Sequence, residues 1–347
     1  MVIDVSGSPY EQGFVHGKSA ASLIRWNIVT VKNLIQSSKI SWESYNNYLN
    51  KNRNYLENHC ADLLEELQGI ADGANVSYDD ILLINIQLYF MADKLPSECT
   101  TIIARGSATL DGKTYIVKNR DMRGEYKHII LRRRYPDGVN CTEVHVAGTV
   151  TYAGSGMNNM GLAVSTTGLW SPTHPLDTSL IEQSELQLNL SSILHECRCV
   201  DDVTKFVQKS KRMIRLNLFA IDATKAQLYE VVDDDYAAIQ DDDGILVRSN
   251  HFLSEKLKDY SPTPEEYPSS YARYERATSF LKSRHGKIRF QDMLQIASDH
   301  ENGGNCLCRH GGAAGSITSY SSICVLEDYQ LWTSLRNPCE SLVLAEL

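Results

Sequence analysis

The sequence predicts an α+β protein in which two antiparallel sheets pack together with helices outside. Three observations support this fold class. Helical patterns dominate as far as Phe90, strands grouped in hairpins begin at Thr100, and helical and strand blocks alternate again from about residue 179. Strands that follow one another through tight turns pair antiparallel, whereas a parallel sheet needs a long crossover after each strand. The pattern therefore favours a layered sandwich over a βαβ fold.

Helix signals mark the N-terminal block. Ser8 precedes Pro9 and stands three residues before Glu11, which is the capping-box pattern of a helix start. Gly13 and Gly17 lie four residues apart on one face of this helix, where small residues let a neighbouring element come close. Further helices are expected over 41–58, 60–74 and 77–90.

Turn sequences divide the next block into hairpins. Asp111-Gly112, Pro136-Asp137-Gly138 and Asn158-Asn159-Met160-Gly161 each separate two strand-like runs. Residues 179–211 return to a helical pattern, and strands resume over 216–232 and 244–253. A helical stretch over 269–300 leads to a last set of strands over 316–344.

Composition restricts the class of partner. The formal net charge is −9 and the isoelectric point is about 5.6, which argues against nucleic acid or an anionic membrane as a partner. The basic run Arg132-Arg133-Arg134 is expected at a solvated strand edge or turn. No stretch approaches the roughly 18 apolar residues of a membrane-spanning helix, so we expect a cytoplasmic protein.

The cysteines do not indicate a disulfide framework, although a zinc site formed by four of them is conceivable. There are nine of them, scattered and without a Cys-x-x-Cys pair. Cys197/Cys199 and Cys306/Cys308 have a spacing that puts both thiols on one face of a strand, but it is not the usual zinc-finger spacing. The dinucleotide-binding glycine loop and the GxSxG nucleophile elbow are both absent.

Cys99 stands where the helical pattern gives way to strands, in the stretch PSECTTIIARG (96–106). A cysteine at a chain terminus can act alone, because its own α-amine, with an ordinary pKa of about 8, can deprotonate the thiol. This requires cleavage of the Glu98–Cys99 bond, which the thiol can start by attacking the preceding carbonyl. One hairpin later, Asp121 is expected to emerge on the adjacent strand near Cys99.

Seven motifs occur along the chain in order: GSPYEQGFVHG, ELQGIADGANVSYDDILLINI, ECTT, KNRD, GMNNMGLAVS, RSNHFL and DHENGGNCLCRH. Together they resemble the acyl-coenzyme A:6-aminopenicillanic acid acyltransferase (isopenicillin N acyltransferase) family of N-terminal-nucleophile (Ntn) cysteine hydrolases. The resemblance implies a four-layer αββα sandwich formed by a single domain, 1–347. It also implies cleavage into a short chain, 1–98, and a long chain, 99–347, which stay together as a heterodimer.

The resemblance also implies roles for individual residues. Cys99 is the expected nucleophile and its freed amine the base, Asp121 orients the amine or the substrate, and Asn250 donates to the oxyanion. Glu98, Cys99 and Thr101 are the residues expected to take part in autoprocessing. The candidate substrate-binding residues are Lys118, Arg120, Asn158, Arg309 and Ser319. No cofactor and no metal ion are implied.

The implied activity is that of an autoprocessing amidase or acyltransferase. It would cleave a linear amide through a thioester on Cys99 and pass the acyl group to water or an amine, with acyl-coenzyme A as one candidate substrate. Penicillin-active relatives have an arginine in a late strand region that aligns near AGSITSYSSI (314–323), where the polar side chains of this sequence are all hydroxyls. Lys118, Arg120 or Arg309 would have to supply that positive charge.

Two other interpretations stay open. One is a non-catalytic relative that keeps the sandwich and binds a small metabolite or a partner protein. The other is an unprocessed cysteine–histidine peptidase that uses His251 or His310. Homo-oligomerisation is also left open.

Overall fold

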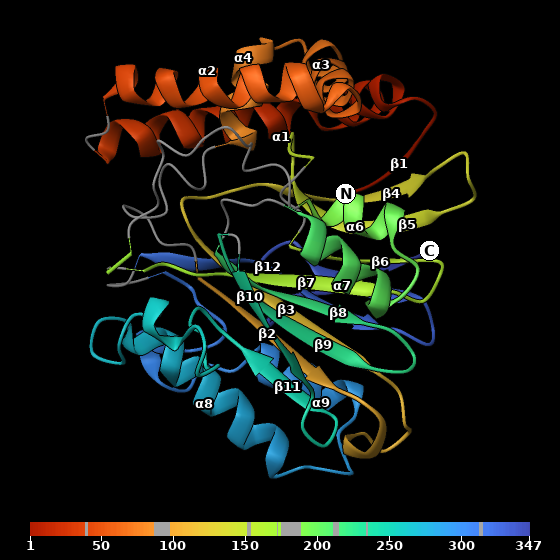
Figure 1. Cartoon of the computed structure of the whole chain (residues 1–347), viewed down its shortest axis with the longest axis vertical. Coiled ribbons are helices and arrows are strands. Elements are labelled where there is room, and N and C mark those ends of the chain that lie inside the picture. The colour runs from red at the N-terminus through yellow and green to blue at the C-terminus, as the bar shows by residue number, and fades with distance from the viewer. Residues whose placement is uncertain are drawn as a thin grey trace.

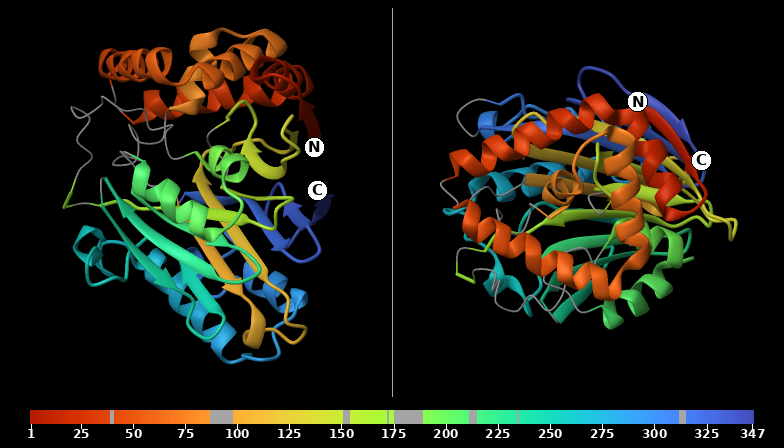
Figure 2. Two further views of the ribbon diagram at one scale, coloured as in Figure 1. Left: turned by 45° about the vertical axis from the view of Figure 1, so that its right-hand side comes forward. Right: turned by 90° about the horizontal axis from the view of Figure 1, so that it is seen from above.

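Two sheets and two helical layers make up the computed structural model, which describes residues 1–38, 41–86, 98–150, 154–171, 173–174, 189–210, 215–233, 235–311 and 315–347. The layers stack in the order helices, sheet, sheet, helices (Figure 1). Figure 2 shows the same stacking from a second side, with the N-terminal helices (red to orange) and the C-terminal helices (blue) at opposite ends. The predicted αββα class is confirmed.

Within the described residues, one sheet has eight strands and the other has six. The eight-stranded sheet consists, in spatial order, of β1 (Val2–Ser6), β4 (His128–Arg134), β5 (Asn140–Val146), β6 (Ser155–Asn158), β7 (Ala163–Gly168), β8 (Leu216–Ile221), β9 (Ala226–Val232) and β10 (Asp235–Gln240). The six-stranded sheet consists of β11 (Ile245–Arg248), β2 (Glu98–Ala104), β3 (Tyr115–Arg123), β12 (Ser316–Val325), β13 (Gln330–Ser334) and β14 (Val343–Glu346).

The helices form the two outer layers. Those over the eight-stranded sheet are α1 (Pro9–Ser37), α2 (Trp42–His59), α3 (Ala61–Ala74), α4 (Tyr78–Asn85), α6 (Leu190–Glu196) and α7 (Val200–Lys209). Those over the six-stranded sheet are α8 (Pro268–Lys282) and α9 (Phe290–Ala297). Short 3₁₀ turns are η1 (Gly106–Ala108), η3 (Lys258–Tyr260) and η4 (Gly303–Asn305).

Pairing within the sheets is antiparallel with one exception. The edge strand β1, which the sequence did not predict, pairs parallel with β4. Parallel strands need a long connection, and between β1 and β4 the chain passes through helices α1–α4 and through strands β2 and β3 of the other sheet. The predicted turns lie where expected, with Gly112, Gly138 and Gly161 all at positive φ.

Two predicted helical stretches are divided in the structure. The stretch 179–211 contains α6 and α7, separated by the extended residues Cys197 and Cys199, and residues 179–188 lie outside the described part of the chain. The stretch 269–300 contains α8 and α9, separated by a turn with Gly286 at φ +77°. The end of the helix expected to reach Phe90 also lies outside the described residues.

The basic run at 132–134 is solvated only in part, since Arg132 and Arg134 reach solvent and Arg133 does not. β4 lies between β1 and β5, and Arg133 is only 1% exposed. Its guanidinium is 2.7 Å from Glu66 and 3.5 Å from Glu143. A buried guanidinium needs such partners because removing it from water is costly. Arg132 does face solvent, where it pairs with Asp4.

The interior between the sheets contains an apolar cluster. Its side chains come from both sheets and include Ile103, Ile116, Tyr320, Cys324, Ile130, Val144, Met157 and Phe219. Among the described residues, no helix is long and apolar enough to cross a membrane.

The contact between α1 and α3 depends on glycine. A Cβ added at Gly17 would lie 2.3 Å from the Ile70 carbonyl oxygen, and one added at Gly13 would lie 2.1 Å from the Glu66 carbonyl oxygen. Backbone atoms of one helix therefore occupy the space beside the glycines of the other. This confirms the close approach predicted from the spacing of Gly13 and Gly17.

We predict that Gly17→Ala lowers the free energy of unfolding by about 1–3 kcal/mol, because α1 and α3 must move apart to admit the methyl group. The measurement is urea unfolding followed by circular dichroism. Gly304→Ala is the matched control, since nothing lies within 4 Å of a Cβ at that position. Equal stability of the two variants would contradict the close contact.

Candidate active site

Cys99 is the second residue of β2 and is 3% exposed. Because side chains alternate along a strand, Cys99 and Thr101 face one side of the sheet, and Glu98 and Thr100 face the other. The Thr101 hydroxyl lies 2.9 Å from the Ser165 hydroxyl, which belongs to β7 in the other sheet. The Cys99 sulfur therefore faces the interior between the sheets, and Glu98 faces the α8–α9 layer.

Asn250 contacts the backbone nitrogen of Cys99. This nitrogen donates a hydrogen bond of 2.8 Å to Asn250 Oδ1, and Asn250 Nδ2 donates to the Gly168 carbonyl at 2.6 Å. A donor at one end of the amide and an acceptor at the other define its orientation. The structure thus gives Asn250 a contact with the atom that would become the α-amine. Its role as an oxyanion donor stays a prediction.

Arg273, which the sequence reasoning missed, binds residues on both sides of the Glu98–Cys99 bond. One of its terminal nitrogens, Nη1, donates to the Cys99 carbonyl oxygen and, at 2.7 Å, to the Thr100 hydroxyl. The other, Nη2, lies 2.8 Å from Asn250 Oδ1 and 3.3 Å from Glu98 Oε2. This buried guanidinium orients the backbone at the predicted junction.

One sequence signal could have revealed Arg273. The buried positions of α8 follow helical spacing and are Ser269, Ser270, Arg273, Ala277, Phe280 and Leu281. An arginine on such a stripe must be buried, and buried cations need acidic or carbonyl partners. The sequence could therefore have indicated a buried arginine, but not which distant residues bind it.

Glu98 is clamped by cations and hydroxyls. Its Oε2 lies 2.6 Å from Arg309 Nη1 and accepts a 2.6 Å hydrogen bond from Ser269, and its Oε1 accepts one of 3.2 Å from Ser316. Burial alone would raise the pKa of Glu98, but the charges of Arg273 and Arg309 and the hydrogen bonds outweigh it, so the pKa is lowered. The residue before Cys99 is thus held as a buried carboxylate.

Asp121 lies opposite Glu98 on β3 and shares its side of the sheet. It is fully buried, accepts a 2.6 Å hydrogen bond from Thr318, and lies 4.0 Å from Arg309 Nε. Burial raises the pKa of Asp121 despite the nearby arginines. The structure therefore brings Asp121 to Glu98, on the face of the sheet opposite the Cys99 sulfur.

Lys118 lies on the same side of the sheet as the Cys99 sulfur. It is opposite Thr101 on β3, and its ammonium donates to the Thr166 carbonyl oxygen of the other sheet. Complete burial lowers the pKa of Lys118 to about 8, although charge and hydrogen bonding from Cys99 oppose this shift. A buried cation thus accompanies the thiol.

The remaining predicted residues have different positions. Arg120 lies directly opposite Cys99 on β3, and Ser319 donates to the Arg120 carbonyl oxygen at 3.2 Å. Arg309 reaches Glu98 on the helix side, as described above. Asn158 ties the β6–β7 turn to α6 by donating to the carbonyls of Leu194 and Cys197. Asn158 is therefore engaged in the packing of α6 rather than with Cys99.

Neither predicted histidine is bonded to Cys99 in the described part of the chain. His251 lies 2.8 Å from the Ser270 hydroxyl and stacks on Tyr271, and burial lowers its pKa to about 3. His310 lies beside Cys308 and Cys339. A cysteine–histidine dyad on Cys99 has no support from these contacts.

A cavity of about 840 Å³ lies apart from this cluster, between the N-terminal helices and α6. Its lining includes Gln12, His59, Glu66 and His195 but none of the predicted site residues. The chemistry of Cys99 must therefore be judged from its own contacts.

Comparison with known proteins agrees with this architecture. The model of the family Acyl-coenzyme A:6-aminopenicillanic acid acyl-transferase matches residues 108–340, about two thirds of the chain. A curated protein of Archaeoglobus fulgidus, described as uncharacterized, is 23% identical over 339 residues that cover 83% of this chain and 55% of that protein. The chain thus spans about half the length of this relative.

The solved structures that are similar to this chain include two proteins of low sequence identity. A mutant of conjugated bile acid hydrolase from Clostridium perfringens is 13% identical, with a TM-score of 0.51 over 72% of this chain and 92% of that one. Penicillin V acylase from Agrobacterium tumefaciens is 14% identical, with a TM-score of 0.43 over 68% of this chain and 82% of that one. The former likeness establishes a shared fold.

We predict that Glu98→Gln, made in a Cys99→Ala chain, lowers the free energy of unfolding at pH 7 by about 3–5 kcal/mol, because the buried guanidiniums of Arg273 and Arg309 lose the carboxylate that both contact. Since the pKa of Glu98 is lowered by folding, the stabilisation is present above its ordinary pKa and is lost as the pH falls through the folded value. The variant and its parent should therefore converge in acid, as measured by urea unfolding. Exposed Glu255→Gln is the control; a pH-independent difference would contradict the prediction.

We predict that Lys118 makes stability depend on pH in the alkaline range. Its folded pKa of about 8 is below its ordinary value of 10.5, so the cost of burying its charge is full below pH 8 and disappears by about pH 10.5. The wild type should therefore gain about 3 kcal/mol relative to Lys118→Met between these pH values. Exposed Lys205→Met is the control, and parallel curves for wild type and Lys118→Met would overturn the assignment.

Proposed function

Because the chain belongs to the acyl-coenzyme A:6-aminopenicillanic acid acyl-transferase family, we propose that it is an Ntn-type amidase or acyltransferase whose nucleophile is Cys99. The observation that carries this proposal is the 2.8 Å hydrogen bond from the Cys99 nitrogen to Asn250 Oδ1. This hydrogen bond holds the nitrogen that would serve as the catalytic base. The nitrogen lies near the start of β2, and Thr101, the next residue of β2 that faces inward, contacts the opposite sheet.

The first proposed reaction is cleavage of the chain before Cys99. The thiolate attacks the Glu98 carbonyl carbon, the C–N bond breaks, and the departing nitrogen takes up a proton to become the α-amine. Water then hydrolyses the thioester, which releases the Glu98 carboxylate and restores the thiol. Arg273 supports this step because it binds the side chain of Glu98 and the carbonyl of Cys99, and so limits motion around the bond.

The second proposed reaction uses the freed terminus on an amide. The α-amine takes the thiol proton, the sulfur attacks the substrate carbonyl, and the amine half leaves with a proton. Water or a second amine then takes the acyl group from the thioester. Asn250 is in position to accept a hydrogen bond from the α-amine, and the Lys118 ammonium would stabilise negative charge on the sulfur or on the tetrahedral oxygen.

The two fragments are proposed to stay together after cleavage. β1 would belong to the short fragment, and it pairs with β4 of the long fragment. Glu98 would be the last residue of the short fragment, and its side chain would remain bound by Arg309 and Ser269. The N-terminal helices bury apolar side chains against the eight-stranded sheet, which belongs almost entirely to the other fragment.

The contacts around Cys99 also bear on the substrate. The hydroxyls of β12 are used inside the protein, as the pairs Ser316–Glu98, Thr318–Asp121, Ser319–Arg120, Ser321–Asn119 and Ser322–Ser155 show. Arg309 is engaged with Glu98, on the side of the sheet away from the sulfur. We therefore propose that a negative charge on the substrate would meet Lys118 or Arg120, and not Arg309.

We predict that purified wild-type chain contains two fragments, 1–98 and 99–347, that elute together in gel filtration, and that Cys99→Ala stays intact. Intact mass and N-terminal sequencing measure cleavage, and a panel of N-acyl amides measures turnover. Cys60→Ala is the control, because Cys60 is remote from the junction at the start of α3 and should leave processing unchanged.

Two outcomes would contradict the proposal. An uncleaved wild-type chain that hydrolyses amides would exclude the terminal amine as the base and leave Lys118 as the candidate. A cleaved or uncleaved chain in which Cys99 reacts with an amide-mimicking electrophile no faster than the other cysteines would favour a binding protein.

A further inference from the structure

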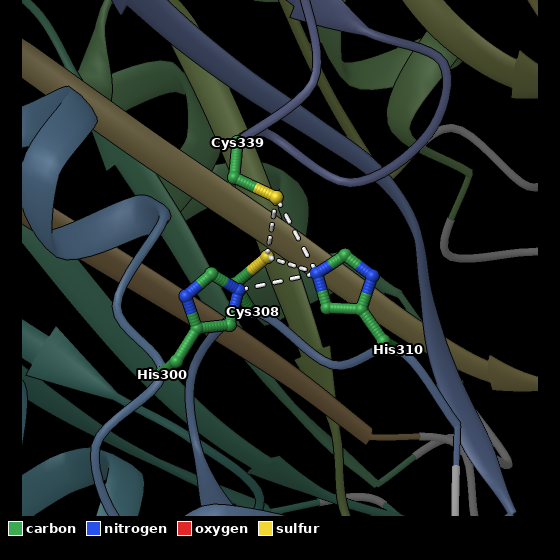
Figure 3. Close-up of side chains that lie close together, drawn as sticks. All are labelled: His300, Cys308, His310 and Cys339. Carbon is green, nitrogen blue, oxygen red and sulfur yellow. Dashed lines mark hydrogen bonds between the residues drawn. The ribbon is translucent and has the colours of Figure 1, made fainter.

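Four side chains with metal-binding atoms converge away from the junction: His300, Cys308, His310 and Cys339 (Figure 3). Their ligand atoms all lie within 4.8 Å of one another. They come from three segments of the chain, since His300 follows α9, Cys308 and His310 precede β12, and Cys339 lies between β13 and β14. None of them is a predicted catalytic residue of the amidase, and only His310 was a candidate, in the peptidase alternative.

Four of the six distances between ligand atoms are close to the edges of a tetrahedron around zinc. With Zn–S near 2.3 Å and Zn–N near 2.0–2.1 Å, those edges are about 3.8 Å for S–S, about 3.3 Å for N–N and about 3.6 Å for S–N. In the structure, Cys308 and Cys339 sulfurs are 3.7 Å apart, and His300 and His310 Nε2 atoms are 3.1 Å apart. His310 Nε2 lies 3.7 Å from the Cys308 sulfur and 3.3 Å from the Cys339 sulfur.

A disulfide does not account for the cluster. The two sulfurs are free thiols 3.7 Å apart, whereas a disulfide bond is about 2.05 Å long. A disulfide would also leave the convergence of the two imidazoles unexplained. Two thiolates and two neutral imidazoles are, in contrast, a common ligand set for structural zinc, and the thiolates balance the charge of the ion.

Neighbouring groups orient one of the ligands, Cys308. Asn337 Nδ2 lies 3.4 Å from the Cys308 sulfur and donates to the Arg309 carbonyl at 2.6 Å. The Cys308 nitrogen donates to the Asp299 carbonyl at 2.9 Å, which joins the segment of Cys308 to that of His300. Hydrogen bonds of this kind hold metal ligands in place and reduce the negative charge density on the sulfur. His300, His310 and Cys339 are exposed, so an ion can enter from solvent.

The cluster is joined to the junction through Arg309. Cys308 and His310 face the cluster, while the side chain of Arg309 between them extends the other way and binds Glu98. This opposite orientation follows the alternation of an extended segment. Fixing Cys308 and His310 would therefore also fix the backbone that presents Arg309 to Glu98.

We propose that His300, Cys308, His310 and Cys339 bind one zinc ion in a closed tetrahedral site that ties the α9–β12 and β13–β14 connections together. Binding would release the two thiol protons to solvent and leave no open coordination position for a substrate. The ion would thus stabilise the fold and position Arg309. The inference stands whether or not Cys99 is an amidase nucleophile.

The test measures metal content directly. Tag-free protein from zinc-supplemented cells, purified without chelators, should contain about one zinc per chain by plasma mass spectrometry. Apoprotein loaded with Co²⁺ under reducing conditions should show the intense visible bands of a tetrahedral site and a thiolate-to-cobalt charge-transfer band. Removal of the ion should lower the melting temperature, and zinc should restore it.

The exposed ligands provide the variants, because substitutions at exposed positions disturb folding least. Cys339→Ser and His300→Ala should each weaken zinc binding at least about tenfold. Cys306→Ser is the matched control, since Cys306 lies two residues before Cys308 but outside the cluster. The hydroxyl of the introduced serine can donate to the Cys308 carbonyl in place of the thiol. It should keep the zinc.

Three results would overturn the proposal. The first is wild-type protein that neither contains zinc nor binds Co²⁺ when reduced. The second is a Cys308–Cys339 disulfide in the isolated protein, found by mass spectrometry. The third is loss of metal in Cys306→Ser equal to that in Cys339→Ser, which would mean that no defined ligand set exists.

Discussion

The Arg273 guanidinium is the interaction on which the junction between the helical and strand segments depends. It reaches the Glu98 carboxylate, the Cys99 carbonyl, the Thr100 hydroxyl and the Asn250 amide oxygen from one position on α8. Because the group is fully buried, each of these acceptors replaces lost hydration, and none can be removed without leaving a charge or a polar atom unsatisfied. Strand β2, helix α8 and the segment after β11 are thereby held to one another.

Because side chains alternate along β2 and β3, the thiol and the carboxylates at this junction lie on opposite faces of the sheet. On the inner face, the Cys99 sulfur and the Lys118 ammonium lie between the sheets, where burial lowers the lysine pKa to about 8. On the outer face, Glu98 and Asp121 share Arg309 within the helical layer. A shift of one residue in the pairing of β2 with β3 would exchange the two faces. The backbone contacts at Cys99 are therefore as important to the proposed chemistry as the side chains.

Much of the fold could be predicted from local patterns. The capping box at Ser8, the hairpin turn at Gly112 and the close approach at Gly17 all depend on residues near one another in sequence. Part of the site could be predicted too, since Lys118 and Asn250 do contact the Cys99 region. Arg273 was not predicted because α8 is far from Cys99 in sequence. Asp121 faces away from the Cys99 sulfur because proximity in a hairpin does not determine which face of the sheet a side chain occupies.

The sequence by itself determined most of the order of helices and strands, the change from helix to strand near Cys99 and the family resemblance, because these depend on spacing over a few residues. Only the tertiary structure decided which buried arginines meet Glu98 and which cysteine joins Cys308. The sequence spacing suggested Cys306 as the partner of Cys308, whereas in the structure the sulfur of Cys339, 31 residues away, lies beside that of Cys308. The physical reason is that contacts between distant segments follow from how layers pack and which face each strand presents, and neither is encoded in the spacing of the residues that meet.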